Sequence, residues 1–121
     1  MRRLALATAL VIVAAPVTAL AQDADFSGNW TTTFGAMHID QDSNGVRGHY
    51  ATNDGRLRAS VEGRALTGYW TESTGKYCSE LRMGTHYWGR IAFRVSRDGS
   101  QFSGHWGYCD AEPTSDWEGH R

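Results

Sequence analysis

The chain contains little proline, little cysteine and almost no lysine. Two prolines and two cysteines occur among its 121 residues, and Lys76 is the single lysine against eleven arginines. The formal net charge is −1. The chain therefore lacks the basic excess that is typical of proteins that bind nucleic acids. We expect no nucleic-acid partner.

After residue 21 the sequence also lacks long apolar runs and compact catalytic motifs. No stretch there is long enough to span a membrane, and none shows helical periodicity. No nucleophile elbow, phosphate-binding loop or CxxC motif occurs, and no motif indicates a cofactor. These absences argue against helical folds and against the enzyme classes that such motifs identify.

Residues 1–21 have the composition of a secretory signal peptide. Arg2 and Arg3 form a basic start, residues 4–17 are apolar, and Ala19-Leu20-Ala21 is a small-x-small cleavage site. We expect cleavage after Ala21 and a single domain over residues 22–121. Removal of the two arginines leaves 10 basic and 13 acidic residues, a net charge of −3. The predicted location is the periplasm or the extracellular medium.

Two cysteines, Cys78 and Cys109, follow the predicted cleavage site. In an exported chain the expectation is a disulfide bond. The closed loop of about 31 residues corresponds to a stabilisation of about 3–4 kcal/mol in the chain-entropy treatment. Two free thiols are the alternative.

One five-residue pattern occurs four times, as 26-FSGNW-30, 46-VRGHY-50, 66-LTGYW-70 and 102-FSGHW-106. Each copy reads apolar, polar, glycine, any residue, aromatic. The regular spacing of the first three copies predicts hairpins of similar length. We expect each glycine to face a crowded interior where a side chain would clash, and each aromatic ring to face inward two residues later.

Apolar and polar residues alternate with period two between the turn signals. In 56-RLRASVE-62, for example, Leu57, Ala59 and Val61 share one face, which is typical of an antiparallel sheet with one dry side. Gly35 is expected to kink the first long strand. The turn signals are 42-DSNG-45, 53-NDG-55, 63-GR-64 and 97-RDGS-100. The predicted strands are residues 26–34, 36–42, 46–52, 56–62, 65–71, 86–96, 101–108 and 115–121.

Short loops also predict the register, because a hairpin must keep its apolar residues on one face. Closing eight such strands removes exposed sheet edges. We therefore predict an all-β fold, a single antiparallel up-and-down barrel of about eight strands, with a flattened β-sandwich as the alternative. The predicted pairs are Val61 with Leu66, Leu57 with Trp70, Val95 with Phe102, and Ile39 with Gly48.

The segment 28-GNWTTTFGAMHI-39, followed by 48-GHY-50, resembles the opening strands of avidin and streptavidin. That resemblance implies a secreted, calycin-like (lipocalin-like) eight-stranded barrel. Tyr50 and Thr52 match a tyrosine and a serine of the biotin site of that family. Ala36 and Thr32 stand where the family has a serine and an asparagine, and its late aspartate has no match. The resemblance thus implies the barrel and argues against biotin.

A second resemblance covers most of residues 22–121. The glycine–aromatic hairpins and the ending 117-WEGHR-121 are similar to those of a group of small exported bacterial proteins, which close with the pattern Trp-x-Gly-x-Arg. This resemblance implies export and a barrel, and it brings no activity with it.

Aromatic residues are the main candidates for a binding site. Tyr50, Trp70 and Trp106 lie on predicted strands that run in the same direction, so their rings should gather towards one barrel end. With Trp30 and Tyr108 they are expected to line a pocket for a small apolar or aromatic molecule, since an eight-stranded barrel is just wide enough for one small ligand. The alternative is that these rings only form the core.

Polar residues suggest two further kinds of site. His38 and His49 face each other if Ile39 pairs with Gly48. Two imidazoles could supply two ligands of a zinc or copper site, but a third ligand is missing. Two carboxylates across a cleft are able to cleave a glycosidic bond. The alternative in both cases is a set of solvated surface groups. The loop carboxylates are Glu72, Glu80, Asp110, Glu112 and Asp116.

The loop 72–86 is long for so small a barrel, and Cys78 tethers it. Its apolar members Tyr77, Leu81 and Met83 suggest a protein-binding surface, for instance one that inhibits a secreted hydrolase. Alternatively the loop caps the barrel. Trp88 points outward in the predicted register. It is either an exposed partner surface or is covered by arginines or by this loop.

Overall fold

The strands begin and end close to the turn signals of the sequence. The structure is a computed structural model that describes residues 5–14 and 22–121. The predicted cleavage site at residues 19–21 lies outside the described residues. Eight strands and one turn of 3₁₀ helix (Thr52–Asp54) are present: β1 (Gly28–Thr32), β2 (Gly35–Asp42), β3 (Gly45–Tyr50), β4 (Gly55–Glu62), β5 (Ala65–Thr71), β6 (Trp88–Val95), β7 (Gln101–Tyr108) and β8 (Ser115–His120).

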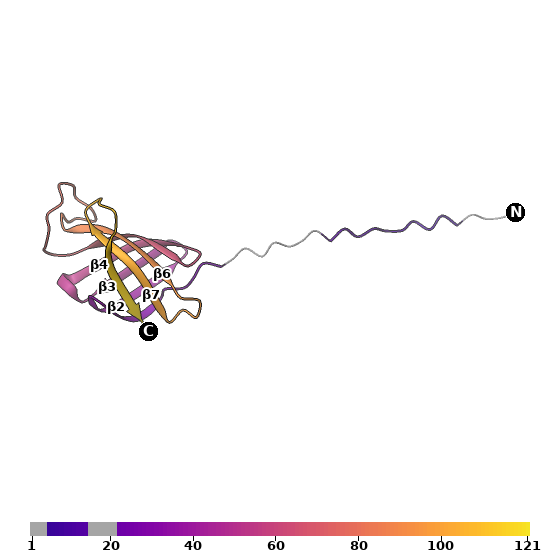
Figure 1. The fold of residues 1–121 in the computed structure, drawn as a ribbon. Helices are drawn as coiled ribbons and strands as arrows, with labels where there is room; N and C mark the ends of the chain where they lie inside the picture. The colour runs from indigo at the N-terminus through magenta and orange to yellow at the C-terminus, as the bar shows by residue number, and fades with distance from the viewer. Residues whose placement is uncertain (1–4, 15–21) are drawn as a thin grey trace.

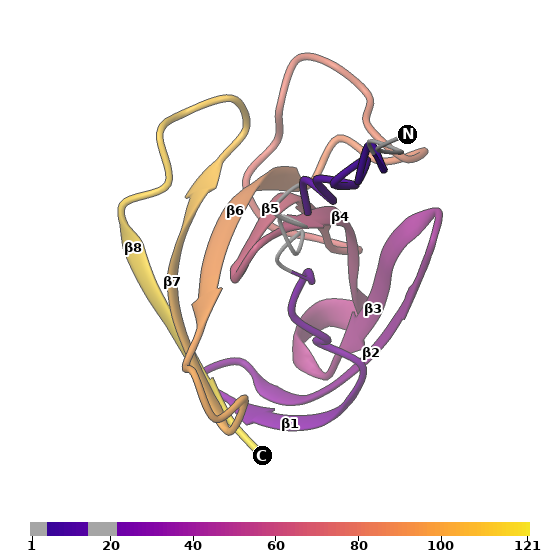
Figure 2. The same ribbon diagram turned by 90° about the vertical axis from the view of Figure 1, so that its right-hand side faces the viewer.

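The eight strands close into an antiparallel barrel in sequence order, with β8 pairing back onto β1. Figure 2 shows the strands following one another around the ring. The up-and-down barrel is therefore confirmed, and the chain does not form the flattened sandwich. All four predicted pairs occur in the observed register: Val61 with Leu66, Leu57 with Trp70, Val95 with Phe102, and Ile39 with Gly48.

The first strand is shorter than the predicted segment 26–34. The backbone N–H of Phe26 donates to the Gln41 side chain at 2.8 Å instead of entering a strand ladder. After β1 the chain turns through Thr33 and Phe34, and β2 begins at Gly35, whose φ of +93° suits glycine. Gly35 is thus at a hairpin turn, where the kink was predicted.

The barrel has two unlike ends. The loop end carries residues 33–34, 51–54, 72–87 and 109–114, and its two longest connections project together from the strands (Figure 1). The turn end carries the short connections 43–44, 63–64 and 96–100. No helix in the described ranges is long and apolar enough to cross a membrane, and residues 5–14 form neither helix nor strand.

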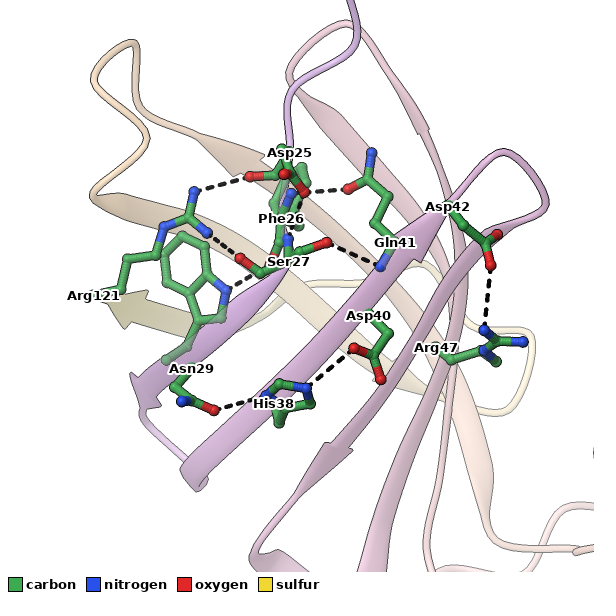
Figure 3. Close-up of polar contacts among 11 residues, drawn as sticks. Asp25, Phe26, Ser27, Asn29, His38, Asp40, Gln41, Asp42, Arg47 and Arg121 are labelled. Carbon is green, nitrogen blue, oxygen red and sulfur yellow. Dashed lines mark hydrogen bonds and ion pairs between the residues drawn. The ribbon is translucent and has the colours of Figure 1, made fainter.

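Residues 22–27 close the turn end. Ala24 donates its N–H to the Gly63 carbonyl at 2.7 Å, and the Gly63 N–H donates to the Asp23 carboxylate at 2.8 Å. The Gln41 amide donates back to the Ala24 carbonyl at 2.9 Å. Figure 3 shows Gln41 and Arg121 reaching this segment from opposite sides. Phe26, which belongs to this segment, is fully buried, so the segment plugs this end of the barrel.

Aromatic rings fill the middle of the barrel in a continuous series. Phe93 and Phe102 stack with ring centroids 4.4 Å apart, and Trp117 packs edge-on against Phe93 at 5.2 Å. The series continues from Phe102 to Trp30 at 5.1 Å, and from Trp117 to Tyr50 at 4.9 Å. The interpretation of the rings as core is therefore correct for this middle section.

The repeated glycines explain how the rings fit. A Cβ on Gly104 would collide with the Ala92 carbonyl oxygen and the Phe93 ring, and a Cβ on Gly68 would collide with the neighbouring strand. Gly48 is less crowded, at 3.2 Å from Leu57. The inward, crowded position is thus confirmed in these three copies. Gly28 differs, since its nearest neighbour is the Arg121 side chain at 3.8 Å.

Candidate functional site

A pocket of about 270 Å³ opens at the loop end, above the filled middle of the barrel. Trp117 is 2% exposed and separates this pocket from the buried Phe93 below it. Phe34 packs edge-on between Trp117 and Trp106, at 4.9 and 5.7 Å. The barrel is therefore both a packed core and a shallow cup. The aromatic walls of the cup are Phe34, Trp70, Trp106, Tyr108 and Trp117.

The sheet fixes the orientation of the two principal tryptophans. Trp70 and Trp106 are near the ends of β5 and β7, two parallel-running strands on either side of β6. Their ring centroids are 5.9 Å apart. The Trp70 indole donates to the Gly107 carbonyl at 3.1 Å. Trp70 is thus locked by the scaffold, whereas Trp106 is only half-buried and faces the pocket.

Among the described residues, Glu72 is the only charged one that lines this pocket. Glu72 extends the pairing of β5 by one residue, because its backbone N–H donates to the Tyr87 carbonyl at 2.8 Å. Its side chain accepts a 2.6 Å hydrogen bond from the Tyr50 hydroxyl and a 3.1 Å bond from the Asn53 amide. These bonds hold the carboxylate at the rim of an otherwise aromatic pocket.

Tyr50 is buried beside this carboxylate. Desolvation raises the pKa of the Tyr50 phenol far above its ordinary value, and the hydrogen bond to Glu72 adds to the rise. The phenol therefore remains a neutral donor, and it serves to position Glu72.

Four of the five predicted ligand-binding residues come together. Trp70, Trp106 and Tyr108 line the pocket, and Tyr50 reaches it through Glu72. Trp30 is placed elsewhere: its indole donates to the Phe26 carbonyl at 2.9 Å, towards the plugged turn end.

Sequence reasoning missed Phe34, Trp117 and Glu72 as pocket residues. Phe34 was predicted at the end of the strand 26–34, but β1 ends at Thr32 and Phe34 lies in the following turn. Trp117 pairs with Gly104 across β7 and β8, so the glycine of the fourth repeat was a usable signal. Glu72 was considered only as half of a carboxylate pair.

Trp117 also carries a buried donor. Its indole nitrogen has no hydrogen-bond partner among the described residues. A buried donor without a partner costs about 1–3 kcal/mol.

The loop 72–86 is held by three kinds of contact. The Cys78–Cys109 disulfide is present as predicted, with a sulfur–sulfur distance of 2.08 Å. The Arg82 guanidinium stacks over Tyr69 and Trp88, at 3.8 and 4.6 Å from the ring centroids. Trp88 is 2% exposed and donates its indole N–H to the Glu80 carbonyl at 2.8 Å. Of the two interpretations of Trp88, the covered one is correct.

The same loop leaves apolar side chains in solvent. Tyr77 and Leu81 are 62% and 64% exposed, and Met83 is also exposed. Tyr77 stacks on the His86 ring at 4.3 Å. The loop therefore folds over the outer wall of β5 and β6, where Tyr69 and Trp88 lie, with an apolar outer surface.

The two predicted histidines do face each other, since His38 pairs with His49. Each imidazole has partners of its own, however. His38 contacts Asn29 at 2.7 Å and Asp40 at 3.2 Å (Figure 3), and His49 contacts Arg56 at 2.7 Å. Within the described ranges no group of three potential ligands could hold a metal ion.

The candidate carboxylates do not converge on the pocket. Of the five loop carboxylates, Glu72 alone lines it. A two-carboxylate hydrolase requires both groups within one cleft, and the described residues offer no second carboxylate there.

Comparison with known protein families, with curated proteins and with solved structures found no match. The assignment of the barrel therefore depends on its strand pairing alone.

Proposed function

We propose that this chain is an exported β-barrel that binds one small apolar or aromatic molecule in the pocket at its loop end. The observation that carries this proposal is the pocket of about 270 Å³ walled by aromatic rings, with Trp106 half-buried in its wall. Ligand sites are typically apolar clefts of about 300–1,000 Å³ with a few placed polar groups. The volume favours a ligand at the small end of that range.

The filled interior of the barrel favours a binding site over a surface depression. The plug of residues 22–27 and the rings below Trp117 make the barrel rigid, so the cup is preformed.

The test is a titration of the oxidised protein with a panel of small aromatic and apolar compounds, followed by tryptophan fluorescence. We expect saturable quenching that is lost in Trp106→Ala. Tyr108→Ala should weaken it as well. Tyr77→Ala is the matched control, because Tyr77 is an exposed tyrosine of the loop end outside the pocket. No response to any compound, with emission that an aqueous quencher cannot reach, would exclude the binding role.

A second candidate function is protein binding through the loop 72–86, including inhibition of a secreted hydrolase. Its support is the exposure of Tyr77, Leu81 and Met83 on a loop fixed by the disulfide. Assays of secreted glycosidases and proteases with the wild type and with Leu81→Ser would test it. Inhibition that Leu81→Ser abolishes and Tyr108→Ala retains would favour this function over the first.

Export is part of the proposal. The disulfide and the exposed apolar side chains of residues 5–14 support it. Cleavage after Ala21 would also preserve the contacts of Asp23 and Ala24 that plug the turn end. N-terminal sequencing of the protein recovered from the periplasm or medium should begin at Gln22.

A further inference from the structure

We infer that the ligand of this pocket is an organic cation, an ammonium group carried on a small apolar body. The inference rests on the proposed function and narrows it. Its basis is the combination of aromatic ring faces with one carboxylate, Glu72, which is the only charged group that the described residues contribute to the pocket lining.

The carboxylate is the first step of the argument. Glu72 supplies a negative charge to the pocket lining, and among the described residues its carboxylate accepts hydrogen bonds only from two neutral donors, on Tyr50 and Asn53. A carboxylate offers about four acceptor sites, so two remain. An anionic ligand would meet repulsion there, because no arginine, lysine or histidine lines this pocket within the described ranges.

The rings are the second step. Aromatic faces attract cations, and most strongly when the cation is desolvated. Elsewhere the chain covers such faces with its own arginines: Arg82 covers Tyr69 and Trp88 on the outer wall, and Arg121 lies 4.2 Å from the Trp30 centroid at the turn end. The pocket rings of Trp70 and Trp106 have no such internal cation among the described contacts.

Lys76 is the third step. Its ammonium lies 5.3 Å from the centroid of the Tyr108 ring. It is the single lysine of the chain, and it forms no ion pair with a described residue. Tyr108 itself lines the pocket. Lys76 itself does not line the pocket, so this contact shows that the Tyr108 ring accepts an alkylammonium group at the edge of the pocket.

The experiment compares three probes of similar shape: phenyltrimethylammonium, its neutral isostere tert-butylbenzene, and the anion benzenesulfonate. Affinities are measured by tryptophan fluorescence at low and high salt. We expect the cation to bind about tenfold more tightly than the neutral isostere, with affinity that falls as salt rises. The anion should bind least.

Three variants locate the effect. Glu72→Gln keeps an oxygen that can accept from Tyr50, and it should weaken the cation about tenfold while leaving the neutral probe unchanged. Glu80→Gln is the matched control, since Glu80 is an exposed carboxylate of the same loop outside the pocket. Lys76→Met should strengthen cation binding about threefold by removing a like charge beside the Tyr108 ring. Near-ultraviolet circular dichroism confirms that each variant is folded.

The outcomes separate the two proposals. If the neutral probe binds as tightly as the cation and Glu72→Gln changes neither, the cation inference is wrong while the binding pocket stands. If none of the probes binds and the broader panel also fails, the pocket itself is not a ligand site. Equal weakening by Glu72→Gln and Glu80→Gln would indicate diffuse surface attraction and would also overturn the inference.

Discussion

The Tyr50 hydroxyl donates a 2.6 Å hydrogen bond to the Glu72 carboxylate across the rim of the aromatic pocket. This bond links a ring of the core to the charged group that lines the pocket. Because Tyr50 is buried and Glu72 only partly so, the phenol fixes where the carboxylate lies. The contact therefore joins the stability of the barrel to the electrostatics of its mouth.

The first prediction concerns alkaline pH. The raised pKa of Tyr50 means that the folded state retains the phenol proton after the unfolded state has released it. This contribution to stability is complete below about pH 10 and is lost as pH rises beyond that value. In urea unfolding between pH 8 and pH 11.5, the wild type should lose up to about 1.4 kcal/mol per pH unit relative to Tyr50→Phe.

At neutral pH the same variant should be less stable than the wild type by about 1 kcal/mol, because it loses one hydrogen bond and keeps its ring. Parallel pH curves for the two proteins would show that the Tyr50 phenol ionises as freely in the fold as in the unfolded chain.

The second prediction concerns the disulfide. It closes a loop between residues 31 positions apart in sequence. Replacing both cysteines by serine should lower the free energy of unfolding by about 3–4 kcal/mol, measured by denaturant titration. Reduction of the wild type should give a similar loss. A loss below about 1 kcal/mol would mean that the Arg82 stack holds the loop without help from the covalent bond.

The sequence was sufficient for the fold because its local signals agree with one another. Alternation places Leu57 and Val61 on one face, and the two-residue turn after Glu62 then allows one register, in which Leu57 meets Trp70. A slip by one residue would turn every apolar side chain of the strand into solvent. Alternation and turn length also agree at the other short turns, so the strand pairs of the barrel could be predicted one after another.

The candidate site was only partly predictable. Strand direction predicts that Trp70 and Trp106 lie towards the same end of the barrel, but it does not specify how far along the barrel axis each side chain lies. Strands in a barrel are tilted and staggered, so Trp30, in the same place within its repeat, packs against Phe102 away from the pocket. Phe34 and Trp117 depend on a turn and on cross-strand packing, which alternation within a strand does not describe.

The third prediction concerns the repeated glycine. In Gly104→Ala the new methyl group would meet the Ala92 carbonyl oxygen and the Phe93 ring, and both belong to the rigid middle of the barrel. Overpacking of this kind typically costs about 1–3 kcal/mol, and we expect a value at the upper end. Ser103→Ala is the control, because Ser103 is the exposed neighbour on the same strand. Equal stability of the two variants in urea would contradict the role assigned to the glycine.

The last prediction concerns the seam of the barrel. The pairing of β1 with β8 consists of two residue pairs, Thr31 with His120 and Thr32 with Gly119. Arg121 adds to this seam, since its guanidinium donates to the carbonyls of Asp25 and Ser27 at 2.9 and 2.7 Å (Figure 3). Its Nε donates to the Gly99 carbonyl at 2.7 Å, and the group stacks over Trp30.

Arg121→Ala should therefore lower the free energy of unfolding by about 2 kcal/mol, a value reduced for the exposure of the side chain. Amide hydrogen exchange at Thr31 and Thr32 should accelerate as the seam opens. Arg121→Lys should be intermediate, because an ammonium cannot reproduce the three directions of the guanidinium fork. Arg97→Ala, at an exposed arginine of the β6–β7 turn, should change neither quantity. If Arg121→Ala matched Arg97→Ala in both, the two residue pairs and the hydrogen bond from the Thr33 N–H to the Glu118 carbonyl would suffice to close the barrel.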